Sequence, residues 1–232
     1  MKSSIALLGV AFVLASGGAS AQVANGSFES PVVPSGGFAN FVVGSSGIPG
    51  WTVVGPAGAV VSIVSTTFGQ NGVSFQAQSG AQWLDLTGDG SNSSEGVSQA
   101  ATTIAGHQYE VTFFVGNTTG GSIFGTTSTV NLAVNGVQAF SAVNSMTDAT
   151  GLSWQQFAYD FVATGTSTTL ALSNGDPGGD NSNGLDNVAF IDQGPVTAPV
   201  PEPETYTMMI AGFAALGFAV RKRKARRNER LS

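Results

Sequence analysis

Short stretches of alternating apolar and polar residues recur through the middle of this chain. In 109–115 the odd-numbered positions carry Tyr, Val, Phe and Val, and in 157–161 they carry Phe, Tyr and Phe. A period of two places these side chains on one face of an extended segment, which is the pattern of a β-strand with one buried face. No stretch of the middle sustains the period of a helix. The sequence therefore predicts an all-β fold.

Turn-forming residues separate these stretches. Asn135-Gly136 lies between two of them, and this dipeptide supplies the positive φ angles of a two-residue hairpin turn. The chain has 32 Gly and only 9% charged residues, as expected for a turn-rich β protein. We expect one jelly-roll sandwich over residues 22–192, a length typical of a single domain. Its predicted strands are 60–64, 82–86, 109–115, 129–134, 137–140, 157–161, 168–172 and 185–191.

The body of the chain contains no Lys or Arg. Of the eight basic residues, Lys2 lies at the start and the other seven lie beyond Val220, whereas eleven acidic residues lie in 22–199. Such a body repels a phosphate backbone, which binds proteins through Lys and Arg, so we expect no nucleic-acid partner. Cations and neutral sugars are the small partners that this charge permits.

Few residues are available for catalysis. The chain has no Cys and only one His, His107, which excludes thiol chemistry and a metal cluster built on several imidazoles. No Gly-x-Ser-x-Gly motif marks a serine nucleophile. Asp85 with Glu110 or Asp160 could form the carboxylate pair of a glycosidase, but nothing in the sequence sets their separation. We expect a protein that is not an enzyme.

The first 21 residues have the three parts of a secretory signal peptide. Lys2 supplies the positive charge, 5–15 is an apolar run, and Ala19-Ser20-Ala21 is a small-residue cleavage site. The mature chain is therefore expected to begin at Gln22.

The other end carries a linker, an apolar run and a basic tail. Four prolines in 193–204 predict an extended linker. The uncharged run 205–220 would span about 24 Å as a helix, slightly less than the hydrocarbon core of about 30 Å, and we expect it to cross the membrane. The tail 221–232 then stays on the cytoplasmic side. The basic residues that set this orientation are Arg221, Lys222, Arg223, Lys224, Arg226 and Arg227.

These three parts together resemble the PEP-CTERM sorting signal. The motif itself is Val200, Pro201, Glu202 and Pro203, followed by the apolar run and the basic cluster in the required order. The resemblance implies export in a Gram-negative bacterium that makes extracellular polysaccharide. It also implies transient retention in the inner membrane, and processing near Pro-Glu-Pro by an exosortase-type membrane protease or transpeptidase. The product would reside on the cell surface or in the extracellular matrix.

The body resembles the choice-of-anchor C group, which is similar to a cell-wall-associated domain-of-unknown-function family (six-four-two). The segments that carry the resemblance are Asn25-Gly26-Ser27-Phe28-Glu29, Ile48-Pro49-Gly50-Trp51, Trp83-Leu84-Asp85-Leu86 and Leu185-Asp186-Asn187-Val188. The resemblance covers nearly all of 23–191. It implies a galactose-binding-like jelly roll, the fold of many carbohydrate-binding modules.

The resemblance also implies a structural calcium. In related carbohydrate-binding jelly rolls, a Glu near the first segment and an Asp of the last strand help to hold the ion. The matching residues are Glu29 and Asp186, and hard carboxylate oxygens suit calcium. The alternative is that Asp186 caps a turn and that Glu29 is simply exposed.

Trp51 is the expected stacking surface for a sugar. Trp83 and Trp154 fall in strand patterns and are expected in the core, whereas Trp51 follows Pro49-Gly50.

The function that we expect is an exported surface or matrix protein whose non-catalytic domain binds polysaccharide. A structural or adhesive matrix role without a sugar ligand is the alternative, and an exopolysaccharide hydrolase comes third.

Overall fold

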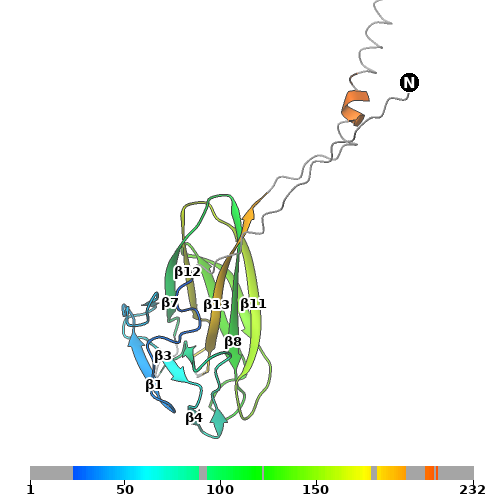
Figure 1. The fold of residues 1–232 in the computed structure, drawn as a ribbon. Helices are drawn as coiled ribbons and strands as arrows, with labels where there is room; N and C mark the ends of the chain where they lie inside the picture. The colour runs from blue at the N-terminus through cyan, green and yellow to red at the C-terminus, as the bar shows by residue number, and fades with distance from the viewer. Residues whose placement is uncertain are drawn as a thin grey trace, which may run out of the picture. The chain divides into compact units, whose positions relative to one another are not determined.

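The protein is described by a computed structural model in which its strands form a sandwich of two main sheets (Figure 1). The chain divides into two compact units, 1–195 and 196–232. All the named strands lie in the first unit. The residues that the structure describes are 23–88, 93–121, 123–178, 182–196, 207–211 and 213.

Both main sheets are antiparallel. The six-stranded sheet has the order β1 (Phe38–Val42), β3 (Val60–Ser65), β6 (Gln82–Asp85), β13 (Gly184–Pro195), β8 (His107–Asn117) and β11 (Ser153–Val162). The five-stranded sheet has the order β10 (Val137–Asn144), β9 (Ser128–Val134), β12 (Ser167–Asn174), β7 (Gly96–Thr102) and β2 (Thr52–Val54). A small hairpin joins β4 (Gly69–Gln70) to β5 (Val73–Ser74). This is the predicted all-β jelly-roll sandwich.

Every predicted strand overlaps a strand of the structure. The predicted hairpin turn is also confirmed, because Asn135 and Gly136 have φ angles of 51° and 80° between the paired residues Val134 and Val137. Strand β13 runs on to Pro195, where it still pairs with His107. The strand therefore extends three residues past the predicted domain end, into the stretch expected to be linker.

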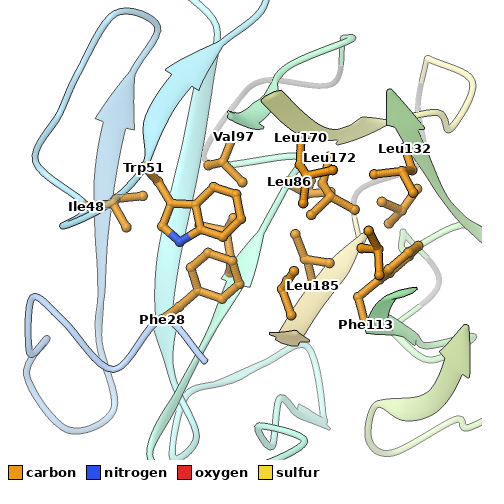
Figure 2. Packing of buried hydrophobic residues seen from close by; sticks show 14 of the residues in the cluster. Phe28, Ile48, Trp51, Leu86, Val97, Phe113, Leu132, Leu170, Leu172 and Leu185 are labelled. Atoms are coloured by element: carbon orange, nitrogen blue, oxygen red, sulfur yellow. The ribbon is translucent and has the colours of Figure 1, made fainter. Parts of the chain in front are cut away.

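The main core lies between the two sheets. The odd-numbered residues of β8 from Tyr109 to Val115 are fully buried there, as their alternation predicted. Leu132, Leu170 and Leu172 face them from the five-stranded sheet. The first segment of the body closes one side of this core, where Phe28 packs beside the ring of Trp51 (Figure 2).

A second, smaller cluster lies on the outer side of the six-stranded sheet. It gathers around Trp83, and the segment that contains the β4–β5 hairpin supplies Val73 and Phe75. Trp154 packs edge-on against Trp83, with ring centroids 5.9 Å apart. The Trp154 ring is so close to two strands that a Cβ added at Gly116 or Gly184 would lie 2.9 or 2.8 Å from its carbon atoms. These two glycines therefore make the space that the ring fills.

The second unit contains a short helical stretch. Residues 207–211 and 213 are helical, and no helix within the described residues is both long and apolar enough to cross a membrane. The expected signal peptide 1–21, most of the expected membrane segment and the basic tail lie outside the described residues.

Replacing Gly184 with Ala should destabilise the domain by about 1–3 kcal/mol, the usual range for overpacking. The reason is that the Trp154 ring cannot move away freely, because its Nε1 donates a hydrogen bond to the Gln76 carbonyl at 2.9 Å. Chemical denaturation measures the difference. Gly165→Ala is the control, since its nearest neighbour would be 4.0 Å away, and equal stability of the two variants would contradict the prediction.

Candidate functional site

Polar and aromatic side chains gather on the outer side of β11, β8 and β13. Because the odd-numbered residues of β8 face the core, its even-numbered residues face outward. Strand pairing sets outward residues of the three strands side by side in rows. We call these rows the β11–β8–β13 face, and they are Gln156–Phe114–Asp186, Ala158–Thr112–Ala189 and Asp160–Glu110–Ile191.

Two carboxylates lie opposite one another on this face. Asp160 pairs directly with Glu110 across β11 and β8, and directly opposed residues of such strands have Cβ atoms about 4.5–5.5 Å apart. Gln193 Nε2 donates a hydrogen bond to Glu110 Oε2 at 3.2 Å. The body has no Lys or Arg to neutralise the pair. The carboxylate oxygens can therefore accept hydrogen bonds from hydroxyl groups or bind a cation.

Asp85 does not join this pair. It lies in β6, beyond β13 in the strand order, and its Oδ1 accepts hydrogen bonds from the Thr87 amide and hydroxyl. Burial raises the pKa of Asp85 to about 6, against the effect of those hydrogen bonds. The structure thus places Glu110 next to Asp160, and it separates both of them from Asp85.

Two aromatic rings accompany the carboxylates. Phe114 is half-buried in the middle of its row, next to the exposed Gln156. Trp154 is also half-buried, two residues before Gln156 on the same side of β11. Phe114 lies beside the Gln156 amide, and the Glu110–Asp160 pair lies two rows further along the same face. An aromatic ring can contact the apolar face of one sugar unit, and amide and carboxylate groups further along can hydrogen-bond to the hydroxyls of other units.

Asp186 lies at the edge of this face and is covered by a loop. Its Oδ2 accepts hydrogen bonds from the amides of Gln78 and Ser79, at 3.0 and 3.2 Å. Its Oδ1 accepts a third from the amide of Asn187 at 2.7 Å. Three backbone donors thus satisfy a carboxylate that is 0% exposed.

Glu29 holds the other end of the same loop. Its Oε1 accepts hydrogen bonds from the amides of Ala81 and Gln82, at 2.9 and 3.2 Å. A Cβ at Gly80 would lie 2.2 Å from that oxygen, so only glycine permits this close approach. Glu29 and Asp186 therefore join the first segment, the 78–82 loop and the last strand.

The charges of this carboxylate pair suit a cation. Burial, joined by the nearby negative charge of Glu29, raises the pKa of Asp186 to about 7, against the hydrogen bonds from the three amides. Among the residues that the structure describes, no three His, Cys, Asp or Glu side chains form a metal cluster. Neutral oxygens would have to complete the coordination of an ion. Two hard carboxylates without a basic partner fit calcium in charge and in atom type.

The expectation that Trp51 lies on the surface is wrong. Its side chain is buried, the residue being 2% exposed. Its Nε1 donates a hydrogen bond to the Asn25 carbonyl at 3.0 Å, and its ring lies 5.6 Å from that of Phe28. Trp83 is equally buried, so Trp154 is the most exposed of the three tryptophans.

The predicted sorting residues lie outside the described part of the chain. This applies to Val200, Pro201, Glu202 and Pro203 and to the basic cluster from Arg221 to Arg227. The sequence comparison below therefore provides the evidence for them.

Solved structures similar to this chain share its fold. A cyclase from Fischerella sp. TAU is 18% identical with a TM-score of 0.55, covering 77% of this chain and 100% of its own. A Stig cyclase from the same organism, in complex with an indole compound, is 17% identical with a TM-score of 0.53, covering 75% and 98%. The CBM22-1 xylan-binding domain of Paenibacillus barcinonensis Xyn10C is 20% identical with a lower TM-score of 0.43, covering 69% of this chain and 97% of its own. No curated protein matches the sequence.

Two family profiles match the sequence in separate regions. The PEP-CTERM protein-sorting motif matches residues 199–224, which confirms the sorting signal and indicates export with membrane-associated sorting. The profile described as "Protein of unknown function (DUF642)" matches residues 21–191. Since that match covers most of the chain and all but the end of the sandwich, the protein belongs to the DUF642 family.

Proposed function

We propose that the sandwich domain acts outside the cell as a non-catalytic module that binds neutral polysaccharide on the β11–β8–β13 face. The observation that carries the proposal is the combination on one face of the Phe114 ring, the Gln156 amide and the Glu110–Asp160 pair. The sorting motif supports the proposal, because we expect it to deliver the domain to the cell surface or matrix, where it would meet such a polymer.

The charge of the body favours a neutral ligand. A polysaccharide carrying carboxylate or sulfate groups would be repelled, because the body has no Lys or Arg to pair with them. The hydroxyl groups of one unit of a neutral polysaccharide can donate hydrogen bonds to Glu110 and Asp160, while the ring face of another unit packs on Phe114, two rows away. The alternatives are a matrix role without a sugar ligand and hydrolysis by the Glu110–Asp160 pair.

Asp160→Ala and Gln156→Ala should each weaken binding to neutral polysaccharide several-fold, and Phe114→Ala should weaken it at least about tenfold, or about 1.4 kcal/mol. Affinity electrophoresis and isothermal titration of the purified protein measure the loss. Thr169→Ala is the control, because it changes an exposed side chain of β12 in the other sheet. A melting curve of each variant separates lost binding from lost folding.

The outcomes distinguish the three candidate functions. Failure of the parent to bind any glycan of a neutral array would overturn the proposal and leave the matrix role. Release of reducing ends by the parent, abolished in Glu110→Gln, would instead establish a hydrolase.

We also propose that Glu29 and Asp186 hold a calcium ion that stabilises the domain. The support is the position of both carboxylates at the 78–82 loop, where their charges meet no basic side chain. The ion would neutralise the pair, and Glu29 and Asp186 would keep the loop attached through their hydrogen bonds. Binding to the folded state alone shifts the unfolding equilibrium by mass action.

Calcium should raise the melting temperature by roughly 5–10 °C at a hundredfold excess over its dissociation constant, and magnesium should do less. Without calcium, stability should fall as the pH rises from 3.8 towards about 7, because the buried Asp186 must lose its proton later than it does in the unfolded chain. The calcium effect should therefore be largest above pH 7. Asp186→Asn should remove this pH dependence and the part of the calcium effect that depends on the Glu29–Asp186 pair, and thermal unfolding with calcium or chelator measures both.

Asp192→Asn is the matched control for this measurement. It removes a carboxylate that bonds His107 and Tyr109 away from the 78–82 loop. If chelation left the melting temperature of the parent unchanged, and elemental analysis found no calcium, the site would be ruled out.

Replacing Arg221, Lys222, Arg223, Lys224, Arg226 and Arg227 with Gln should block maturation, because the positive charges fix the cytoplasmic end of the apolar run. Immunoblotting of the membrane and secreted fractions of a bacterial host that has the sorting machinery measures precursor and product. Arg230→Gln leaves the cluster intact and should mature normally. Equal maturation of the cluster variant and the parent would contradict the sorting mechanism.

A further inference from the structure

A layer of polar side chains closes one end of the space between the sheets. It lies where β8, β10 and β12 end and where β7, β9 and β13 begin. Apolar residues of the core occupy the next inward positions along these strands, such as Val97, Val115 and Leu172. The polar layer consists of Glu95, Asn117, Ser128, Asn144, Asn174 and Asn183, each no more than 2% exposed.

Hydrogen bonds fix the orientation of the amide groups in this layer. Asn174 donates from Nδ2 to the Ser93 carbonyl at 2.7 Å, and its Oδ1 accepts from the Asp176 amide at 3.0 Å. Asn183 Nδ2 donates to Asn174 Oδ1 and to the Thr129 carbonyl, at 2.7 and 2.6 Å. Exchanging the N and O atoms of Asn183 would place an oxygen against two acceptors. Its orientation is therefore determined.

Two side-chain oxygens of consecutive residues at this end are buried without a hydrogen bond. They are Asn183 Oδ1 and Ser182 Oγ, in residues that are 0% and 1% exposed. Buried polar atoms in proteins nearly always have a partner, so such atoms point to a bound ion or molecule.

Two carboxylates lie at the same end. The Asn174 amide donates to the Glu95 carbonyl at 2.8 Å, which places these residues side by side, and Glu95 is 0% exposed. Asp176 Oδ1 accepts a hydrogen bond from the Thr129 amide at 2.5 Å. No basic residue neutralises them, because the body has no Lys or Arg and His107 bonds Asp192 where β8 begins, at the opposite end of that strand.

We propose that this polar end binds a calcium ion through Glu95, Asp176, Asn183 Oδ1 and Ser182 Oγ. Carboxylate, amide and hydroxyl oxygens are the ligands that calcium prefers. A buried water could satisfy the two neutral oxygens, but it would leave the carboxylates without a counter-charge. The site is separate from the Glu29–Asp186 pair, which holds the 78–82 loop outside the six-stranded sheet.

Calcium counting on the purified protein tests the proposal. After dialysis against low calcium, elemental analysis and isothermal titration should find two ions per chain in the parent and one in Glu95→Gln or Asp176→Asn. Glu29→Gln combined with Asp186→Asn should also retain one ion, so failure of either site can be recognised alone. Asp192→Asn, which removes a carboxylate at the opposite end of β8, should leave the count unchanged.

The stability of the variants gives an independent readout. If Glu95 holds an ion, Glu95→Gln should lower the melting temperature of the protein measured with calcium. Added to the Glu29→Gln, Asp186→Asn double variant, it should also remove most of the rise in melting temperature that calcium still causes there. An unchanged calcium count in both Glu95→Gln and Asp176→Asn would overturn the proposal. So would a Glu95→Gln variant as stable as the parent in calcium, since the carboxylate would then not hold an ion.

Discussion

Backbone amide groups are the main donors to the carboxylates of this domain. A body without Lys or Arg cannot form the usual ion pairs, and among the described residues the one contact of this kind joins His107 to Asp192. Carboxylates instead accept hydrogen bonds from backbone N–H groups, whose partial positive charges stabilise an anion without a full counter-charge. The residues that accept such bonds include Glu29, Asp85, Asp148, Asp176, Asp186 and Asp192.

These hydrogen bonds determine where the loops sit. Glu29 and Asp186 together fix the 78–82 loop against the six-stranded sheet. Asp176 fixes the segment after β12 to the start of β9. A chain without disulfides thus connects segments that are distant in sequence by side-chain to backbone bonds, and a cation at either carboxylate group would strengthen a link that the protein already makes.

Local pattern predicted the strands far better than it predicted the sites. The alternation of apolar and polar residues predicted β8 and β11 correctly. It missed β7, because the sequence of Gly96–Thr102 is built mainly of small and polar residues. The pairing of Asp160 with Glu110 depends on strand register, which no single stretch encodes. Trp51 was placed wrongly because the Gly50 turn, with φ of 85°, directs the chain inward onto Phe28. The carboxylates of Glu29 and Asp186 came from a family resemblance, and the structure brings them to one loop.

The position of β13 has a mechanical consequence. The strand lies inside the six-stranded sheet, paired with β8 along most of its length and with β6 at its start. It is also the last strand before the sorting segment, since it ends at Pro195. Any tension carried by the chain beyond Pro195 therefore acts first on the part of β13 that pairs with β8. It reaches Gly184 and Leu185, which also pair with β6, only after the pairing with β8 has been broken along the strand. Hydrogen bonds along most of β13 must therefore break before the strand leaves the sheet.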